Sequence, residues 1–122
     1  MAISSFRDLR VWQAAMELVV EVYRLTGVLP RQETYGLASQ MQRGAVSIPS
    51  NVAEGHAREH IKEYLNHLSM AQGSLAELET QMEIAQRLKY LSSEQCQDGC
   101  RKDAVRWEAA LCSPQFTPQG RC

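Results

Sequence analysis

The stretch IKEYLNHLSMAQGSLAELETQMEIA, residues 61–85, decides the fold of this protein. Its apolar side chains recur at alternating spacings of three and four, the pattern with which one face of an α-helix packs against neighbouring helices. The seam consists of Ile61, Tyr64, Leu68, Ala71, Leu75, Leu78, Met82 and Ala85. Gly73 and Ser74 lie beside this seam and lower the helix propensity, which predicts that another helix approaches closely there.

A second apolar helix is predicted upstream, from about Asp8 to Thr26, and it carries two apolar stripes. A single bundle can cover only part of so wide an apolar surface. We therefore predict that the rest is buried by other subunits and that the protein is a homo-oligomer. We hypothesise that one stripe lies at or near a subunit interface and the other faces the bundle core, and the reverse assignment stays open. The interface stripe is Val11, Leu18, Val22 and Leu25, and the core stripe is Trp12, Met16, Val19 and Tyr23.

Between these two lies a helix predicted to start near Thr34, as N-cap, and to end at Gly55. Its apolar residues recur at helical spacing: Leu37, Met41, Ala45, Ile48 and Val52. Pro49 falls inside this stripe, where it removes a backbone donor and clashes with the preceding turn. The pattern therefore predicts a kink at Pro49 and a helix that continues beyond it.

A fourth helix is predicted to open at Ser92, which with Gln95 has the spacing of a capping box. Its apolar face consists of Cys96, Cys100, Ala104, Trp107 and Leu111. Four helices with short links predict an all-α protein, an antiparallel up-down-up-down four-helix bundle. We expect a single domain over residues 1–112 and a flexible C-terminal tail over 113–122, where two prolines and a glycine occur.

Composition narrows the class of protein without identifying a function. The chain has 122 residues and a formal net charge of −1, with no polybasic arm or acidic tail. No secretory signal or membrane-spanning stretch is recognisable, so we expect a cytoplasmic protein. The four cysteines lie in the last quarter of the chain and form no zinc-binding or disulfide pattern, which favours reduced thiols at Cys96 and Cys100.

No recognisable catalytic arrangement occurs, so we expect a protein that is not an enzyme and uses no cofactor, metal or small-molecule substrate. His56, His60 and His67 could share one helical face, but the charged residues around them favour a solvated polar surface over a metal site. Glu77, Glu79 and Glu83 do not follow the Glu-x-x-His pattern of di-iron bundles. They are interpreted as surface charge.

The stretch YGLASQMQRGAVSIPSNVAEG, residues 35–55, is unusual for a helix interior because it combines Pro49 with small polar side chains. One interpretation is a locally repaired kink, in which hydroxyl and amide groups satisfy backbone groups that the proline frees. The alternative is a recognition surface for a partner. Its candidate residues are Arg43, Ser47, Pro49, Asn51, Glu54 and Gly55.

Three motifs in order carry a family resemblance: LRVWQAA at 9–15, SIPSNVAEG at 47–55 and AQGSLAELE at 71–79. They resemble the four-helix bundle proteins encoded in intervening sequences of bacterial 23S ribosomal RNA genes. That family is similar to the accessory variability determinant of diversity-generating retroelements, a pentameric bundle that binds nucleic acid and a reverse transcriptase. The resemblance implies a ring of five four-helix bundles.

The predicted bundle and the family resemblance are compatible with two functions from different classes. The first is a homopentameric scaffold or interaction module that contacts a protein partner. The alternative is an RNA- or DNA-binding accessory protein, in which assembly gathers basic side chains into a positive ring. The candidate contacts to nucleic acid are Arg43, Arg58, Lys62, Arg101, Lys102 and Arg106.

Overall fold

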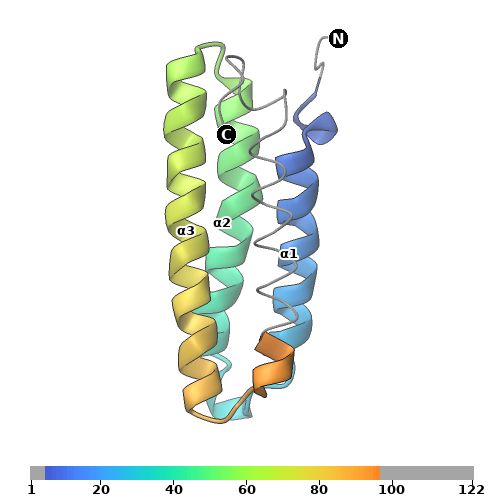
Figure 1. Cartoon of the computed structure of the whole chain (residues 1–122), viewed down its shortest axis with the longest axis vertical. Coiled ribbons are helices and arrows are strands. Elements are labelled where there is room, and N and C mark those ends of the chain that lie inside the picture. The colour runs from blue at the N-terminus through green and yellow to red at the C-terminus, as the bar shows by residue number, and fades with distance from the viewer. Residues whose placement is uncertain (1–4, 97–122) are drawn as a thin grey trace.

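The computed structural model describes residues 5–96, and all regular structure in that range is helical. Three α-helices stand side by side, and two short 3₁₀ helices lie before α1 and α2 (Figure 1). Their bounds are η1 Phe6–Asp8, α1 Arg10–Thr26, η2 Arg31–Glu33, α2 Leu37–Ala57 and α3 Ile61–Arg87. A further helical segment begins at residue 93 and is described as far as residue 96.

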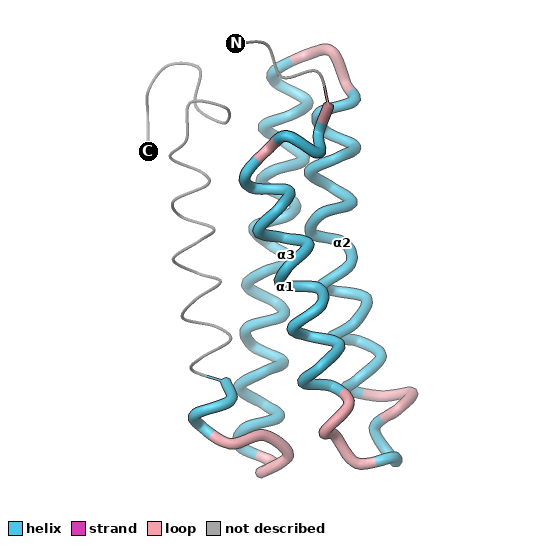
Figure 2. Tube along the Cα trace, turned by 90° about the vertical axis from the view of Figure 1, so that its right-hand side faces the viewer, coloured by secondary structure: helices cyan, strands magenta, loops and turns pink. Residues whose placement is uncertain are grey.

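Helix α2 is the central element of the described part. It packs against both α1 and α3, whereas no pair of Cα atoms within 8 Å joins α1 to α3. Consecutive helices run in opposite directions along the long axis (Figures 1 and 2). Among the described helices, α2 therefore lies between α1 and α3.

The predicted seam of α3 is confirmed. Its residues from Tyr64 to Ala85 are buried or half-buried in the core, and only Ile61, in the first turn, is largely exposed. The predicted stripe of α2 is confirmed as well, since Met41, Ala45 and Ile48 are all completely buried. The 3.6-residue period thus identified the inner faces of both helices.

The assignment of the two stripes of α1 was wrong. Val11, Leu18, Val22 and Leu25, predicted at the subunit interface, are at most 5% exposed within the single chain. They pack in the core together with Ala15 and therefore have no surface left for another subunit. The other stripe faces outward: Trp12 and Val19 are half-buried, while Met16 and Tyr23 are 40% and 49% exposed.

The predicted start of α1 was two residues early, because Phe6–Asp8 forms a 3₁₀ turn instead. The hydroxyl of Ser5 caps this turn by accepting the Arg7 N–H. Helix α1 then begins at Arg10 and ends at Thr26, the predicted end, and Gly27 is its C-cap.

The predicted start of α2 was three residues early. The Thr34 hydroxyl donates to the Arg31 carbonyl, 2.8 Å away, and does not cap α2. The helix begins at Leu37, whose N–H is accepted by a carboxylate oxygen of Glu33 at 3.2 Å. The other oxygen of the same carboxylate accepts the Tyr90 hydroxyl at 3.0 Å, so Glu33 joins the start of α2 to the segment after α3.

The end of α2 also differs from the prediction, because the helix passes through Gly55 and ends at Ala57. Gly55 is buried against α3, and both Glu54 and Gly55 offer carbonyls to the N–H of Arg58. Pro49 lies inside the helix, which continues beyond it.

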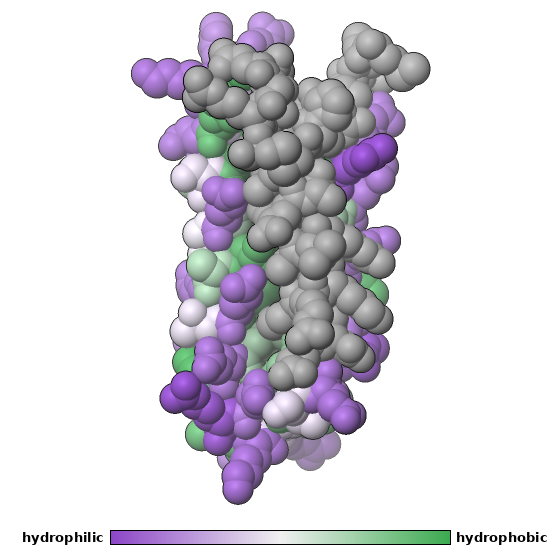
Figure 3. All heavy atoms as spheres, in the orientation of Figure 1, coloured by the Kyte–Doolittle hydropathy of each residue, from purple (hydrophilic) through white to green (hydrophobic). Residues whose placement is uncertain are grey.

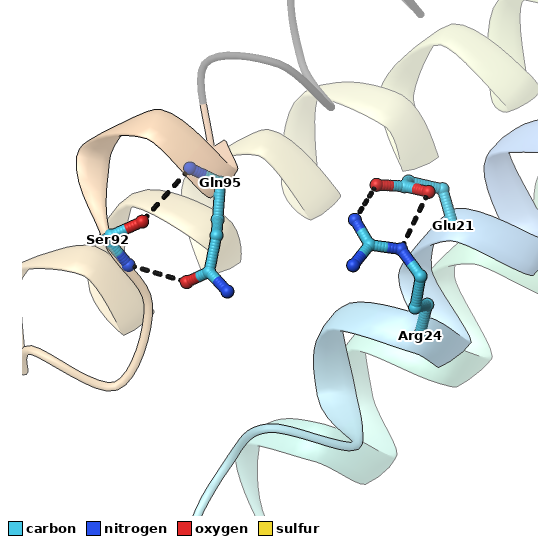
Figure 4. A network of polar contacts seen from close by, with 4 residues as sticks. All are labelled: Glu21, Arg24, Ser92 and Gln95. Atoms are coloured by element: carbon cyan, nitrogen blue, oxygen red, sulfur yellow. Dashed lines mark hydrogen bonds and ion pairs between the residues drawn. The ribbon is translucent and has the colours of Figure 1, made fainter.

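The capping box predicted after α3 is present (Figure 4). The Gln95 N–H donates to the Ser92 hydroxyl at 3.1 Å, and the Ser92 N–H donates to the Gln95 side-chain oxygen at 2.9 Å. Cys96 is buried and its thiol lies 3.7 Å from the Met82 carbonyl. The rest of the predicted fourth helix and the tail lie outside the described residues.

Candidate functional site

The stretch from Arg43 to Gly55 forms the middle of α2 and presents three different sides. One side faces the core, one faces α3 and one faces α1. The candidate residues of the recognition surface are distributed over these sides. Arg43 and Glu54 are exposed, Ser47 and Asn51 are half-buried, and Pro49 and Gly55 are buried.

Small polar side chains around Pro49 bond to the backbone of their own helix. The Ser47 hydroxyl donates to the Gly44 carbonyl at 2.7 Å, and the Ser50 hydroxyl donates to the Val46 carbonyl at 2.8 Å. The Asn51 amide donates to the Ser47 carbonyl at 2.8 Å. Pro49 deprives the carbonyl four residues before it, that of Ala45, of its helical donor. Two of the three bonds thus go to the carbonyls on either side of the freed one, and the third goes to that of Ser47.

On the α3 side, Gly55 permits a close approach of the two helices. A Cβ atom at this position would lie 2.7 Å from the Cβ of His67 and 3.1 Å from a ring carbon of Tyr64, so no larger residue fits without movement. Close approach of this kind is a recognised use of glycine. The glycine of the SIPSNVAEG motif is therefore explained by packing.

Asn51 and His67 join α2 to α3 at the same level. Because the Asn51 amide nitrogen donates to the Ser47 carbonyl, its oxygen points to the Nδ1 of His67, 3.4 Å away. An amide oxygen is an acceptor only, so this contact is a hydrogen bond in the tautomer of His67 that carries its proton on Nδ1. The His56 ring meets the Tyr64 ring edge-on, 6.1 Å between centroids.

The histidines were expected on a solvated polar face, and this expectation was wrong for two of them. His56 and His67 are half-buried at the contact between α2 and α3, while His60 precedes α3 and is exposed. Within residues 5–96 no group of three or more His, Cys, Asp or Glu side chains is placed to bind a metal ion. The burial around Tyr64 raises the pKa of its hydroxyl to about 12.

The side of α2 that faces α1 forms an open apolar groove of about 320 Å³. Its lining comes from the outer stripe of α1 and from a second apolar stripe of α2. Pro49, which is buried, belongs to this second stripe. The lining residues are Trp12, Met16, Val19, Val46, Pro49, Ser50 and Ala53. All of them except Ser50 offer apolar side chains.

The α2 half of this groove was missed in the sequence. Val46, Pro49 and Ala53 recur at spacings of three and four, next to the core stripe, and this pattern could have revealed the groove. With it, α2 resembles α1 in having one apolar stripe in the core and another that reaches the surface. Val46 is 41% exposed.

The basic residues predicted to contact nucleic acid do not come together in the described part of the chain. Arg58 and Lys62 flank the turn between α2 and α3, and the Arg58 guanidinium lies 3.5 Å from the Glu54 carboxylate. Arg43 lies four turns away along α2, and its guanidinium donates to the Ser39 hydroxyl at 3.4 Å. Arg101, Lys102 and Arg106 lie outside the described residues.

Among the described helices, none is both long and apolar enough to cross a lipid bilayer.

Comparison with known proteins finds a family and a similar solved structure. The model of a family described as 23S rRNA-intervening sequence protein matches residues 7–105. A crystal structure of a protein of unknown function from the S23 ribosomal protein family of Bacteroides thetaiotaomicron superposes with a TM-score of 0.74 at 22% sequence identity. The match covers 83% of this chain and 94% of that one, and it supports the fold alone. No curated protein sequence matches significantly.

Proposed function

The chain belongs to the 23S rRNA-intervening sequence protein family, and from this premise we propose that it is a cytoplasmic, non-enzymatic scaffold, a ring of five four-helix bundles. Each bundle is antiparallel, as short links between consecutive helices favour. The assembly offers surfaces to a protein partner and performs no chemistry.

The observation that carries this proposal is the apolar groove between α1 and α2. It exposes Met16 and Val46 at 40% and 41%, and Tyr23 continues the same stripe at 49%. Burial of one such side chain is worth about 1.5–3 kcal/mol relative to full exposure, so covering several of them would stabilise an assembly. Contiguous apolar surface of this kind marks an interaction site.

A closed ring is the simplest arrangement that covers this groove in every copy. A head-to-tail contact that does not close would produce fibres, whereas a cyclic assembly leaves no free end. The number five comes from the resemblance of the family to the accessory variability determinant of diversity-generating retroelements. The groove itself supports a contact between copies and does not fix their number.

Light scattering of the purified protein at micromolar concentration tests the proposal. We expect a mass near five chains, and a stable monomer of 13.8 kDa would refute the assembly. Met16→Asp should reduce the mass to that of the single chain, because a charge in the groove opposes its burial. Val20→Asp is the matched control, since Val20 is 69% exposed on α1 and does not line the groove.

Pro49 contributes to the groove, and we propose that it kinks α2 to fit the neighbouring subunit. Pro49→Ala would restore a backbone donor and straighten the helix, so assembly should weaken more than helix content does. Light scattering and circular dichroism of the variant measure the two effects. Unchanged mass and melting temperature would argue against a structural role of the kink.

The alternative, an accessory protein that binds RNA or DNA, requires the assembly to gather basic residues that are apart in one chain. In that case affinity should fall steeply with salt, because neutralised phosphates release counterions. If the protein binds neither RNA nor DNA at low salt, the accessory function is excluded and only the scaffold function remains. Binding that is lost in Arg58→Ala and Lys62→Ala would favour the accessory function.

A further inference from the structure

The outer face of α3 has features that packing within the chain does not explain. Gly73 lies in the middle of a helix of 27 residues, and a Cβ atom there would meet nothing within 4 Å among the described residues. Glycine in a helix interior costs about 1 kcal/mol relative to alanine. Met70 and Ile84, on the same face, are 50% and 44% exposed. Figure 3 shows apolar side chains at the surface on the α3 side of the molecule.

Between Met70 and Ile84 this face carries one carboxylate, that of Glu77, seven residues after the first and seven before the second; seven residues before Met70 the same row begins with the exposed Glu63. Residues seven apart lie nearly above one another on a helix, so the three side chains form one row, with Gly73 next to it. The Glu77 side chain is exposed and no cation of the described residues lies within 4.0 Å of it. From Met70 to Ile84 the row is therefore apolar with a single negative charge.

The groove between α1 and α2 has the opposite charge at its rim. Arg43 lies on α2 three residues before Val46 and seven before Ser50, two residues of the groove lining. Its guanidinium is exposed and has no carboxylate within 4.0 Å in the described part of the chain. The groove and the part of the α3 outer face between Met70 and Ile84 are therefore complementary, because each has apolar side chains and one charge, of opposite sign, that no ion pair within the described residues neutralises.

The two surfaces also lie at the same height along the bundle. Gly55 of α2 lies against His67 of α3. Gly44 of α2 lies against Gln81 of α3, whose side-chain oxygen would be 3.7 Å from a Cβ atom placed on Gly44. Helices α2 and α3 run in opposite directions, so the α3 segment 70–77 is level with the middle of α2 between these two glycines. The groove residues Val46 to Ala53 occupy this part of α2. Rotation about an axis along the bundle keeps heights unchanged, so it can bring the two surfaces together.

We propose that the groove between α1 and α2 receives the outer face of α3 from a second copy of this chain, with Arg43 of one copy paired to Glu77 of the next. The absence of a side chain at Gly73 lets the two backbones approach, and Met70 packs into the apolar groove. This inference rests on the proposed assembly and specifies its contact. Each copy uses two different faces, as a ring requires.

Charge reversal tests the pairing, with light scattering over a concentration series as the measurement. Arg43→Glu and Glu77→Arg should each weaken association at least tenfold, because each places two like charges together. The double variant should restore association to within about threefold of the wild type, since the pair is then re-formed with exchanged signs. Circular dichroism shows whether each variant remains folded. An effect in neither single variant, or no recovery in the double variant, would overturn the pairing.

Glu79→Arg combined with Arg43→Glu is the matched control. Glu79 is exposed on the opposite side of α3 and gives the same net charge, so it should restore nothing. Equal recovery with Glu79→Arg would attribute the effect to net charge and would overturn the proposed contact. Gly73→Gln should fold like the wild type and associate at least tenfold more weakly, because its side chain occupies the contact.

The result for the wild type separates the two proposals. A wild-type monomer would refute the scaffold assembly and this contact together. A wild-type oligomer that is indifferent to all these substitutions would leave the assembly intact and refute the contact alone.

Discussion

Lys89 has a backbone conformation that normally selects glycine. Its φ is 65°, in the left-handed region, directly after the last turn of α3. The Tyr90 N–H donates to the Ala85 carbonyl and the Lys89 N–H to the Gln86 carbonyl, both at 2.9 Å, which is the bonding of a Schellman motif. A residue with a side chain costs about 1 kcal/mol in this position.

We therefore predict that Lys89→Gly raises the free energy of unfolding by about 0.5–1 kcal/mol, because glycine removes the strain. Urea unfolding measures the difference. Lys89→Ala is the control, since it removes the charged side chain and retains the strained conformation, and it should change stability little. A loss of stability in the glycine variant would contradict the prediction.

Gly55 gives a second prediction at the scale of the residue. Gly55→Ala should lower the free energy of unfolding by about 1–3 kcal/mol, because the new Cβ would lie 2.7 Å from the Cβ of His67. Gly44→Ala is the matched control in the same helix. There the Cβ meets only the Gln81 oxygen at 3.7 Å, an ordinary contact, and the helix gains propensity. Thermal or urea unfolding of both variants compares the two sites, and equal effects would show that the close approach at Gly55 is unimportant.

At the scale of the element, the two reciprocal bonds of Ser92 and Gln95 cap the helical segment described at residues 93–96 (Figure 4). Such a box satisfies two backbone donors that would otherwise lack helical partners. It also fixes the direction in which the chain leaves the turn after α3. The ion pair of Glu21 and Arg24 on α1 is also drawn in Figure 4. Because the Arg24 side chain is exposed, this pair contributes little to the stability of the fold, as is usual for surface ion pairs.

Ser92→Ala should cost about 1 kcal/mol of stability. Gln95→Ala should cost less, and the double variant should cost less than the sum, because the two bonds form one motif. Urea unfolding of the four proteins in this cycle provides the coupling energy. Additive costs would show that the two side chains act independently.

At the scale of the whole molecule, stability should depend on the ionisation of Tyr64. Burial raises the pKa of its hydroxyl from 10.0 to about 12, because the anion is disfavoured in the contact between α2 and α3. A raised pKa contributes no pH dependence below about pH 10, and stability is then lost as pH rises from 10 through 12. Urea unfolding at pH 8 and at pH 11 measures the loss. Tyr64→Phe should have a smaller loss over this range, and an identical loss in both proteins would contradict the assignment.

Local patterns in the sequence determined several elements by themselves. The spacing of apolar residues from Tyr64 to Ala85 identified the inner face of α3, because a regular helix needs only its own period to define a face. The capping box at Ser92 was also readable, since both partners lie within one turn of each other. Three separated motifs were sufficient to identify the family.

Only the tertiary structure decided which stripe of α1 faces inward. Both stripes are apolar, so the free energy of burial alone hardly distinguishes them. The core contains Val11, Ala15 and Val22, whereas the larger Trp12 is half-buried and Tyr23 is exposed. The start of α2 was decided in the same way, because Glu33 bonds to Leu37 nearby and to Tyr90, 57 residues further on. Choices of this kind depend on neighbours that are distant in sequence, and local spacing carries no information about them.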